Sequence, residues 1–210
     1  YRRIMGLSKA EAKKKAVEML EMVEIKDAAN KARAYPHELS GGQRQRVMIA
    51  MALASSPKLL IADEPTTALD VTIQKEVLEL MESLQREMGT AIMLITHDLG
   101  VVAQMADHVV VMYGGRVMEK SDVCTIFDRP LHPYTIGLLR ARPTLENRGQ
   151  KLYNIPGNVP PPSEMEGHCP FYSRCDKRMA ICGKEVPELR EHRPGQCVAC
   201  FLYEGEACCG

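Results

Sequence analysis

The 210-residue sequence contains no tryptophan, and aromatic side chains make up only 5% of it. Neither sign of charge is in excess, with 27 basic and 27 acidic residues. Such a balance gives no electrostatic basis for binding nucleic acid or an acidic membrane surface. The longest apolar run, Val47 to Ala54, is far shorter than the roughly 20 residues that span a bilayer. The composition therefore indicates a globular protein without a nucleic-acid partner.

A further absence concerns phosphate binding. The sequence contains no G-x-x-x-x-G-K-S/T loop, whose backbone amides and lysine cradle nucleotide phosphates. The nearest glycine–lysine pair, Gly183-Lys184, is followed by Glu185 and lies in a different context. Any nucleotide chemistry must therefore be inferred from other residues.

The most informative stretch runs from Leu59 to Asp70. Its first four residues are apolar, which predicts a short strand buried on both faces of a parallel sheet. Asp63 and Glu64 follow at the carboxyl end of this strand, where ligands bind in open α/β sheets. We expect Asp63 to hold Mg²⁺, directly or through water, and Glu64 to orient and polarise an attacking water. Taken alone, an acidic turn after a strand explains the pair almost as well.

The string Leu39-Ser40-Gly41-Gly42-Gln43 precedes the acidic pair by about twenty residues. Two glycines after a serine let the backbone approach a ligand closely. A helix predicted from about Gln43 to Ser55 directs its positive end toward the same place. A serine hydroxyl, glycine amides and a helix terminus suit a terminal phosphate. A glycine turn before a buried helix explains the glycines, but not the whole string at this distance from two acids.

His97 follows a second predicted buried strand, Ala91 to Ile95. A helix from about Val71 to Met88, closed by Gly89, connects this strand to the first one. Since parallel strands end at one sheet edge, His97 should reach the same edge as Asp63. A lone histidine is usually structural, but this position favours a site.

The remaining segments predict an alternation of strands and helices, which is typical of an α/β sheet. Ser8 and Glu11 form a capping box that opens a helix, and Ala28 to Ala34 is a second, shorter helical piece. Further elements are expected at Leu99–Ala106 and Asp122–Asp128 (helices), His108–Tyr113 and Arg116–Glu119 (a hairpin through Gly114-Gly115), a helix ending near Arg140, and a proline-rich extended segment between Asn154 and Pro162.

Together, the motifs LSGGQ, LLIADEP, the Ala68-Leu69-Asp70 loop and Ile95-Thr96-His97-Asp98 resemble the ATPase subunit of ATP-binding cassette (ABC) transporters. The resemblance implies an α/β, P-loop NTPase-like fold. It also implies that Asp70 lies at a dimer seam and that His97 contacts both the γ-phosphate and the catalytic carboxylate of Glu64. The residues that would bind ATP held by a partner subunit are Ser40, Gly41, Gly42 and Gln43.

In that family the phosphate loop lies upstream of the matching region, so the resemblance implies a C-terminal fragment without the N-terminal strands and phosphate loop. It assigns residues 1–38 to part of a helical subdomain that docks on a membrane partner and residues 39–120 to the ATPase core. Residues 121–210 form an extension in which the HPYT and IPGNVP strings resemble the C-terminal region of oligopeptide/dipeptide transporter ATPases.

Seven of the 8 cysteines come after residue 168. No secretory signal is visible, so we expect a cytosolic setting in which disulfides are reduced and metal ligation is favoured. Only Cys197 and Cys200 have the CxxC spacing of a zinc knuckle. Four widely spaced thiolates also suit an iron–sulfur cluster, and a small core packed by unmetallated cysteines is the third alternative.

Peptide-transporter ATPases of this type carry the pattern G-C-x-F-x-x-R-C, followed by a third and a final cysteine, and the pattern is associated with a 4Fe–4S cluster. Here His168 is inserted between Gly167 and the first cysteine. Cys197 stands in reserve as a ligand. The resemblance assigns as ligands Cys169, Cys175, Cys182 and Cys200, and the free thiols are predicted to be Cys124, Cys208 and Cys209.

The resemblance therefore implies an ATP-hydrolysing, energy-coupling subunit of an importer of oligopeptides or dipeptides, using ATP and Mg²⁺. Its expected partners are a second ATPase subunit, identical or homologous, two transmembrane permease subunits and, indirectly, a peptide-binding protein. Its expected location is the cytoplasmic face of the cell membrane. One alternative is an inactive fragment that acts as a metal-cluster or interaction module, with negligible ATP turnover alone. The other is a soluble ABC ATPase that serves no transporter.

Overall fold

The computed structural model describes residues 1–67, 69–143 and 152–204. The chain forms two compact units, residues 1–97 and 98–210, and each is described by itself. The division between them falls inside residues 39–120, the range predicted to be one ATPase core. Ala68, Cys208 and Cys209 lie outside the described residues. No helix in the described ranges is both long enough and apolar enough to cross a membrane.

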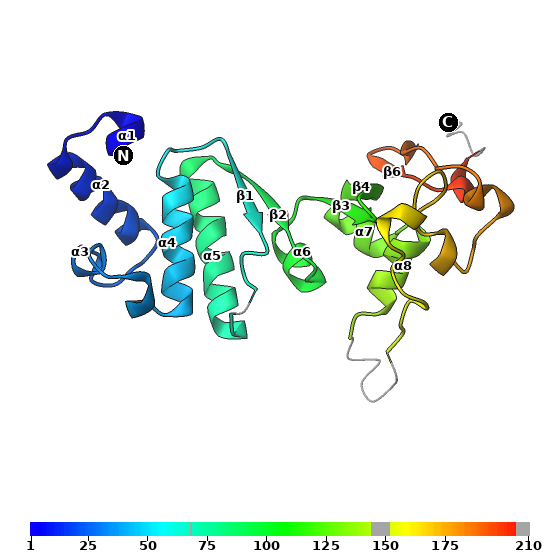
Figure 1. The fold of residues 1–210 in the computed structure, drawn as a ribbon, viewed down its shortest axis with the longest axis horizontal. Coiled ribbons are helices and arrows are strands. Elements are labelled where there is room, and N and C mark those ends of the chain that lie inside the picture. The colour runs from blue at the N-terminus through cyan, green and yellow to red at the C-terminus, as the bar shows by residue number, and fades with distance from the viewer. Residues whose placement is uncertain (68, 144–151, 205–210) are drawn as a thin grey trace. The chain divides into compact units, whose positions relative to one another are not determined.

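The first unit is built around a pair of parallel strands (Figure 1). β1 (Leu59–Asp63) pairs in parallel with β2 (Ala91–Ile95), and α5 (Val71–Met88) connects them. This is the strand–helix–strand arrangement that the sequence predicts. The other helices of the unit are α1 (Arg2–Met5), α2 (Lys9–Met22), α3 (Ala28–Lys31) and α4 (Gly41–Leu53), with a 3₁₀ turn at Pro36–Glu38.

Capping residues determine where helices begin and end in this unit. The Ser8 hydroxyl accepts a hydrogen bond from the Glu11 N–H, and the Glu11 carboxylate accepts one from the Ser8 N–H, which confirms the predicted capping box. Gly89, with φ of 64°, ends α5 as predicted. α4 begins two residues earlier than predicted, because Ser40 and Gln43 form a second capping box.

The prediction that β1 is buried on both faces is wrong. Leu60 and Ala62 are each 9% exposed, whereas Leu59 and Ile61 are 47% and 60% exposed. The buried face packs against α4 and α5, as shown by a small cavity lined by residues of all three elements. No other described element of the first unit covers the opposite face. A run of apolar residues has no period-two signal, so the sequence could not show that one face lacks a covering layer.

Arg46 ties α4 to the helices on either side of it. Its guanidinium lies 2.7 Å from the Glu24 carboxylate, just after α2, and 3.3 Å from the Glu76 carboxylate of α5. It also donates to the Val23 carbonyl at 3.1 Å. The side chain is only 12% exposed. Arg46, near the start of α4, is therefore paired within the unit.

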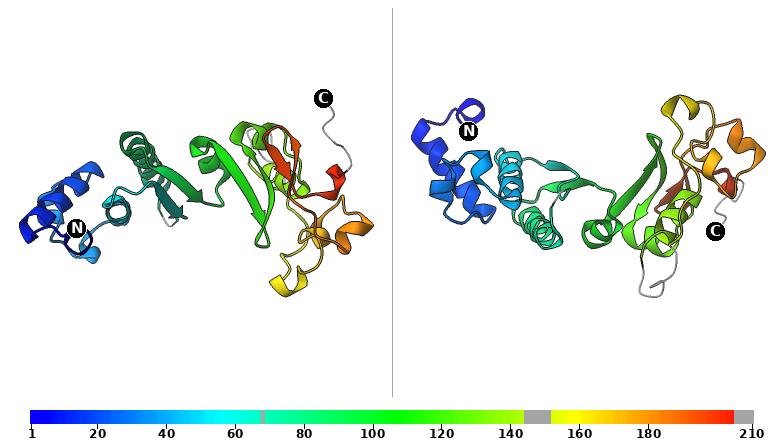
Figure 2. Two further views of the ribbon diagram at one scale, coloured as in Figure 1. Left: turned by 90° about the horizontal axis from the view of Figure 1, so that it is seen from above. Right: turned by 60° about the horizontal axis from the view of Figure 1, so that its bottom comes forward.

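The second unit contains an antiparallel sheet with the order β3-β4-β6-β5. Figure 2 shows the β3–β4 hairpin in green, with the last strands of the chain in red beside it. The hairpin was predicted, whereas the pairing of Glu119 with Val198, which joins the cysteine-rich tail to it, was not. The strands are β3 (His108–Tyr113), β4 (Arg116–Asp122), β5 (Arg190–Arg193) and β6 (Gln196–Val198). The helices are α6 (Leu99–Met105), α7 (Val123–Asp128) and α8 (Pro133–Arg140), with 3₁₀ turns at Pro162–Glu164, Tyr172–Arg174, Ala180–Gly183 and Phe201–Tyr203.

Aromatic side chains form the core of the second unit. The Phe171 ring lies 5.2 Å from Tyr113 and 5.4 Å from Tyr134, in edge-on and tilted contacts. Arg174 holds the proline-rich segment against this core, because its guanidinium donates to the carbonyls of Ile155 and Pro156. Residues of the predicted G-C-x-F-x-x-R-C pattern thus have a packing role in addition to any ligand role.

Glu119 lies at the centre of the second unit with 0% exposure. Its carboxylate accepts hydrogen bonds from the backbone N–H groups of Leu131 and His132 at 2.8 and 3.0 Å, and from the Gln196 side chain at 2.9 Å. The Gln196 amide also donates to the Arg129 carbonyl. One buried carboxylate therefore holds β4, β6 and the start of α8 together.

Removing this carboxylate leaves three buried donors without an acceptor. We expect Glu119→Ala to lower the free energy of unfolding by roughly 3–5 kcal/mol, since each unmet buried donor carries a desolvation cost. Denaturant unfolding of the chain measures the change. The control Glu188→Ala removes an exposed carboxylate paired with Arg190 and should change stability by less than about 0.5 kcal/mol. Equal effects of the two changes would contradict a central role for Glu119.

Candidate functional site

The carboxyl ends of β1 and β2 place Glu64 beside His97. Asp63 is in register with Ile95, and the next residue, Glu64, donates its backbone N–H to the Ile95 carbonyl at 2.9 Å. The Glu64 Oε1 atom lies 3.0 Å from the His97 Nδ1 atom. An ionised carboxylate only accepts hydrogen bonds, so Nδ1 carries the proton and donates it. The two predicted catalytic side chains are therefore in direct contact.

A second hydrogen bond fixes the Glu64 carboxylate. The Thr67 hydroxyl donates to Oε2 at 2.9 Å, and the Thr67 N–H donates to the Glu64 carbonyl at 3.2 Å. The hydrogen bond from Thr67 and then that from His97 hold the pKa of Glu64 below its ordinary value. A carboxylate of lowered pKa is a weaker base, so this arrangement suits orienting a water molecule more than removing its proton.

Glu64 also has a backbone conformation that few non-glycine residues adopt. Its φ is 45°, in the left-handed region. Such strain persists where the surrounding hydrogen bonds overdetermine it, and it is common at functional sites. Here the hydrogen bonds of Glu64 to Ile95, Thr67 and His97 supply that constraint.

Asp63 is the last residue of β1 and is exposed, so its carboxylate is open to a cation. Among the described residues there is no group of three or more His, Cys, Asp or Glu side chains that could hold a metal ion. Mg²⁺ in nucleotide sites needs fewer protein ligands, since it is held by one or two carboxylates together with waters and substrate phosphates. The placement of Asp63 is compatible with that mode.

The Ser40–Gln43 turn forms the N-terminus of α4. The Ser40 hydroxyl accepts from the Gln43 N–H at 3.2 Å, while the Gln43 side chain accepts from the Ser40 N–H at 3.1 Å. Ser40 and Gly41 are exposed. A Cβ atom on Gly42 would lie 2.7 Å from Ile73 of α5, so this glycine is required for close packing of the two helices.

Asp70 lies beside the same turn. It caps α5, because its carboxylate accepts from the Ile73 N–H at 2.9 Å. The Leu69 side chain lies 3.7 Å from the position that a Cβ atom on Gly41 would occupy. The N-termini of α4 and α5 therefore lie together, and Figure 1 shows both at the lower end of this unit. The predicted ATP-binding turn and the predicted dimer-seam residue form one surface.

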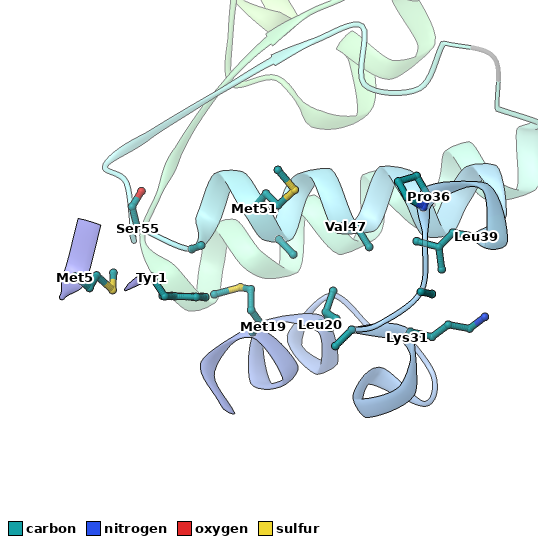
Figure 3. Close-up of a pocket in the computed structure, with 15 residues that line it drawn as sticks. Tyr1, Met5, Met19, Leu20, Lys31, Pro36, Leu39, Val47, Met51 and Ser55 are labelled. Atoms are coloured by element: carbon teal, nitrogen blue, oxygen red, sulfur yellow. The ribbon is translucent and has the colours of Figure 1, made fainter. Parts of the chain in front are cut away.

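Figure 3 shows a mostly apolar pocket of about 510 Å³ in the first unit, between α2 and α4. Met19 and Leu20 contribute from α2, and Val47 and Met51 contribute from α4. None of the predicted catalytic or ATP-binding residues lines it. This pocket is therefore separate from the strand-end site.

The second unit gathers the four predicted cluster ligands around one enclosed pocket. The Cys169 and Cys182 side chains are buried, and Cys175 and Cys200 are half-buried. Cys197 lies in β6 and does not line this pocket, so the structure gives no support to its reserve role. Cys124 is exposed, as expected of a free thiol. The cysteines that line the pocket are Cys169, Cys175, Cys182 and Cys200.

The Met179 N–H donates to the Cys182 sulfur at 3.4 Å. Backbone amides of Phe171, Lys177 and Leu202 act to lower the pKa of Cys169, Cys175 and Cys200, respectively. Burial nevertheless raises the pKa of Cys169 to about 11 and that of Cys200 to about 12. The thiols of Cys169 and Cys200 are therefore protonated near neutral pH, and binding of a metal would release their protons.

His132 lines the same pocket. Its side chain is 1% exposed, and burial lowers its pKa to about 4, so the ring is neutral. In the sequence, the HPYT string carries a family resemblance only, and no pattern there predicts a role for His132, Glu119 or Gln196. The sequence feature that could have indicated a capping role for His132 is its position just before Pro133, at the start of a helix.

Four cysteine thiols around one pocket are the donor set of a sulfur-ligated metal group. Among the described residues, however, no group of three or more His, Cys, Asp or Glu side chains is arranged to hold a metal ion. The structure therefore shows the candidate ligands but not a metal site.

The burial of these thiols predicts their reactivity in the metal-free, reduced chain. Near neutral pH, iodoacetamide should modify Cys124 at least about tenfold faster than Cys169 and Cys200, since only exposed thiolates react. The difference should narrow as the pH rises toward the raised pKa values. Mass spectrometry of peptides over a time course measures the rates. In concentrated urea the rates should converge, whereas equal rates in the folded chain would show that the pocket is open.

Comparison of the sequence with protein families gives two matches. Residues 2–67 match the ABC transporter family, and residues 118–182 match the family described as oligopeptide/dipeptide transporter, C-terminal region. Asp63 and Glu64 fall in the first match, and Cys169, Cys175 and Cys182 fall in the second.

Curated relatives that are more than half identical to this chain include oligopeptide transport ATP-binding proteins. The oligopeptide transport ATP-binding protein AppD of Bacillus subtilis is 54% identical over 201 residues, which cover 96% of this chain and 61% of AppD. OppD of Salmonella typhimurium, also an oligopeptide transport ATP-binding protein, is 53% identical over 93% of this chain and 58% of its own length. The chain thus spans about three-fifths of the length of the curated relatives it matches.

Solved structures of the same fold include cbiO1 from Clostridium perfringens, part of the ABC transporter complex cbiONQ. It is 35% identical with a TM-score of 0.52, and the match covers 60% of this chain and 49% of cbiO1. MJ1267, an ATP-binding cassette of an ABC transporter, matches with a TM-score of 0.53 over 63% of this chain and 51% of the MJ1267 chain. Because the two sequences are only 24% identical, this match supports the fold alone.

Proposed function

The chain belongs to the ATP-binding proteins of oligopeptide/dipeptide ABC transporters, and from this premise we propose that it is the ATP-hydrolysing, energy-coupling subunit of a peptide importer. The observation that carries the proposal is the contact between Glu64 and His97 at the carboxyl ends of two parallel strands. Such an edge is where α/β ATPases bind nucleotide and activate water.

In this proposal each side chain at the strand ends has one task. Asp63 holds Mg²⁺ on the nucleotide phosphates, with waters completing the coordination. Glu64 orients the attacking water, and Thr67 and His97 fix its carboxylate. His97 is 81% exposed, so its other ring nitrogen is accessible to a γ-phosphate and can link the nucleotide to the carboxylate. The barrier is lowered by positioning and electrostatics.

The exposed Ser40–Gln43 turn supplies the second half of the ATP site, for nucleotide held by a partner ATPase subunit. Its support is the exposed N-terminal end of the 13-residue helix α4, whose dipole favours an anion. Asp70, beside this turn, would line the seam between two subunits. Closure on two ATP molecules would then drive two permease subunits, with the chain at the cytoplasmic face of the membrane and a peptide-binding protein delivering the cargo.

We further propose that Cys169, Cys175, Cys182 and Cys200 hold a 4Fe–4S cluster rather than zinc. The support is the pocket that the four thiols share and the wide spacing of these cysteines in the sequence. When bound, the cluster supplies one-electron redox chemistry and cross-links the tail. A fragment that works only as a metal-cluster or interaction module is the second candidate function, and this pocket is the observation that favours it.

The role of Glu64 is tested in the complete ATPase that contains this sequence, assembled with its permease in lipid vesicles. Glu64→Gln should lower ATP hydrolysis at least about 100-fold while ATP still binds, because the amide no longer polarises water as a carboxylate does. Glu79→Gln, an exposed change in α5 at a residue paired with Lys75, should leave hydrolysis unchanged. Normal hydrolysis by the Glu64 variant would remove that residue from catalysis and would undermine the proposed function.

Metal analysis tests the cysteine site separately. Protein purified without oxygen should be brown and should contain iron and sulfide at about four each per chain. Cys200→Ser should lower both contents, whereas Cys197→Ser should not. One zinc per chain in colourless protein would refute the cluster assignment but would leave the ATPase proposal standing.

A further inference from the structure

His132 is held rigidly at the edge of the cysteine pocket. Its backbone N–H donates to the buried Glu119 carboxylate at 3.0 Å, and its ring lies 5.8 Å from the Phe171 ring in a tilted contact. With 1% of the residue exposed, the ring has little room to turn. Its two nitrogen atoms therefore have fixed surroundings.

The hydrogen bond at Nδ1 determines where the ring carries its proton. His132 caps α8, and its Nδ1 atom accepts the backbone N–H of Tyr134 at 3.0 Å. A backbone N–H can only donate, so Nδ1 bears no hydrogen. The single proton of the neutral imidazole must then lie on Nε2, which makes Nε2 a hydrogen-bond donor.

This donor has no acceptor among the described residues. The Nε2 atom is buried and makes no hydrogen bond, although buried donors are nearly always paired and an unmet one is costly. Glu119 cannot serve, since its oxygens already accept from Leu131, His132 and Gln196. The hydroxyl of Thr135 and the amide oxygen of Gln196 are also buried and unpaired, but neither residue lines the pocket.

A bound cluster would bring the missing acceptor. His132 lines the pocket together with the four cysteines, but none of their sulfur atoms accepts from Nε2, whereas a cluster sulfide accepts hydrogen bonds well. We propose that the Nε2–H of His132 donates a hydrogen bond to a sulfide of the bound cluster, and so raises the reduction potential of the cluster. This inference rests on the cysteine site of the proposed function. Its physical basis is that a donor stabilises the more negative, reduced form.

Three variants separate the donor from the other roles of the ring. His132→Asn keeps an oxygen that can cap α8 but removes the N–H at the position of Nε2. His132→Gln gives up the cap but places an amide N–H near that position. His168→Asn is the control, because His168 precedes Cys169 in the sequence yet does not line the pocket.

The test is a potentiometric titration of the anaerobically loaded chain, with the reduced cluster followed by electron paramagnetic resonance. His132→Asn should lower the ratio of reduced to oxidised cluster about tenfold at a fixed potential, which corresponds to about 59 mV for a one-electron couple. His132→Gln should recover most of this loss, and His168→Asn should match the wild type. A wild-type potential in His132→Asn would overturn the inference.

A measurement on the wild-type chain avoids any folding defect of the variants. With ¹⁵N-labelled histidine, the reduced cluster should display a hyperfine coupling to one histidine nitrogen, and His168→Asn should retain it. No histidine coupling in the loaded wild type would overturn the inference and leave the cluster assignment intact. If the chain acquires neither iron nor sulfide, the cysteine site fails and the inference fails with it, whereas the ATPase proposal is tested by Glu64 alone.

Discussion

Polar groups that leave water must find hydrogen-bond partners, and this constraint organises the second unit. In the second unit a fully buried carboxylate, Glu119, collects donors from the start of α8 and from the Gln196 side chain on β6. Because leaving these donors without an acceptor costs much free energy, the network holds β4, β6 and the start of α8 together. The same network contacts the cysteine pocket, because the His132 backbone N–H donates to Glu119 and His132 also lines the pocket.

In the first unit, hydrogen bonds preorient a carboxylate that stays exposed to solvent. The parallel register of β1 and β2 gives the Glu64 N–H an acceptor in Ile95, which fixes the backbone in a strained conformation. Thr67 and His97 then satisfy both oxygens of the side chain. An exposed acid held this firmly pays little further ordering cost when it binds water, which is the property that a positioning group in phosphoryl transfer requires.

Sequence patterns predicted the elements well where the signal was local. The capping residues of α2, the C-cap glycine of α5 and the hairpin at Gly114-Gly115 all lie where they were expected, because caps and turns depend on a few adjacent residues. The burial of β1 was predicted wrongly, since four apolar residues in a row do not tell whether a second layer covers them. The β4–β6 pairing joins residues far apart in the sequence, and no local pattern encodes it.

The sequence by itself determined the chemistry available: a serine–glycine turn, two acids at a strand end, a histidine after the next strand and a cysteine-rich tail. Only the tertiary structure decided which of these groups meet. It placed Glu64 against His97 and gathered four of the tail cysteines around a pocket that excludes Cys197. It also left a proton on His132 Nε2 with no acceptor in the part of the chain it describes. Residue identity fixes donors and acceptors, whereas their pairing depends on distances that only the folded chain sets.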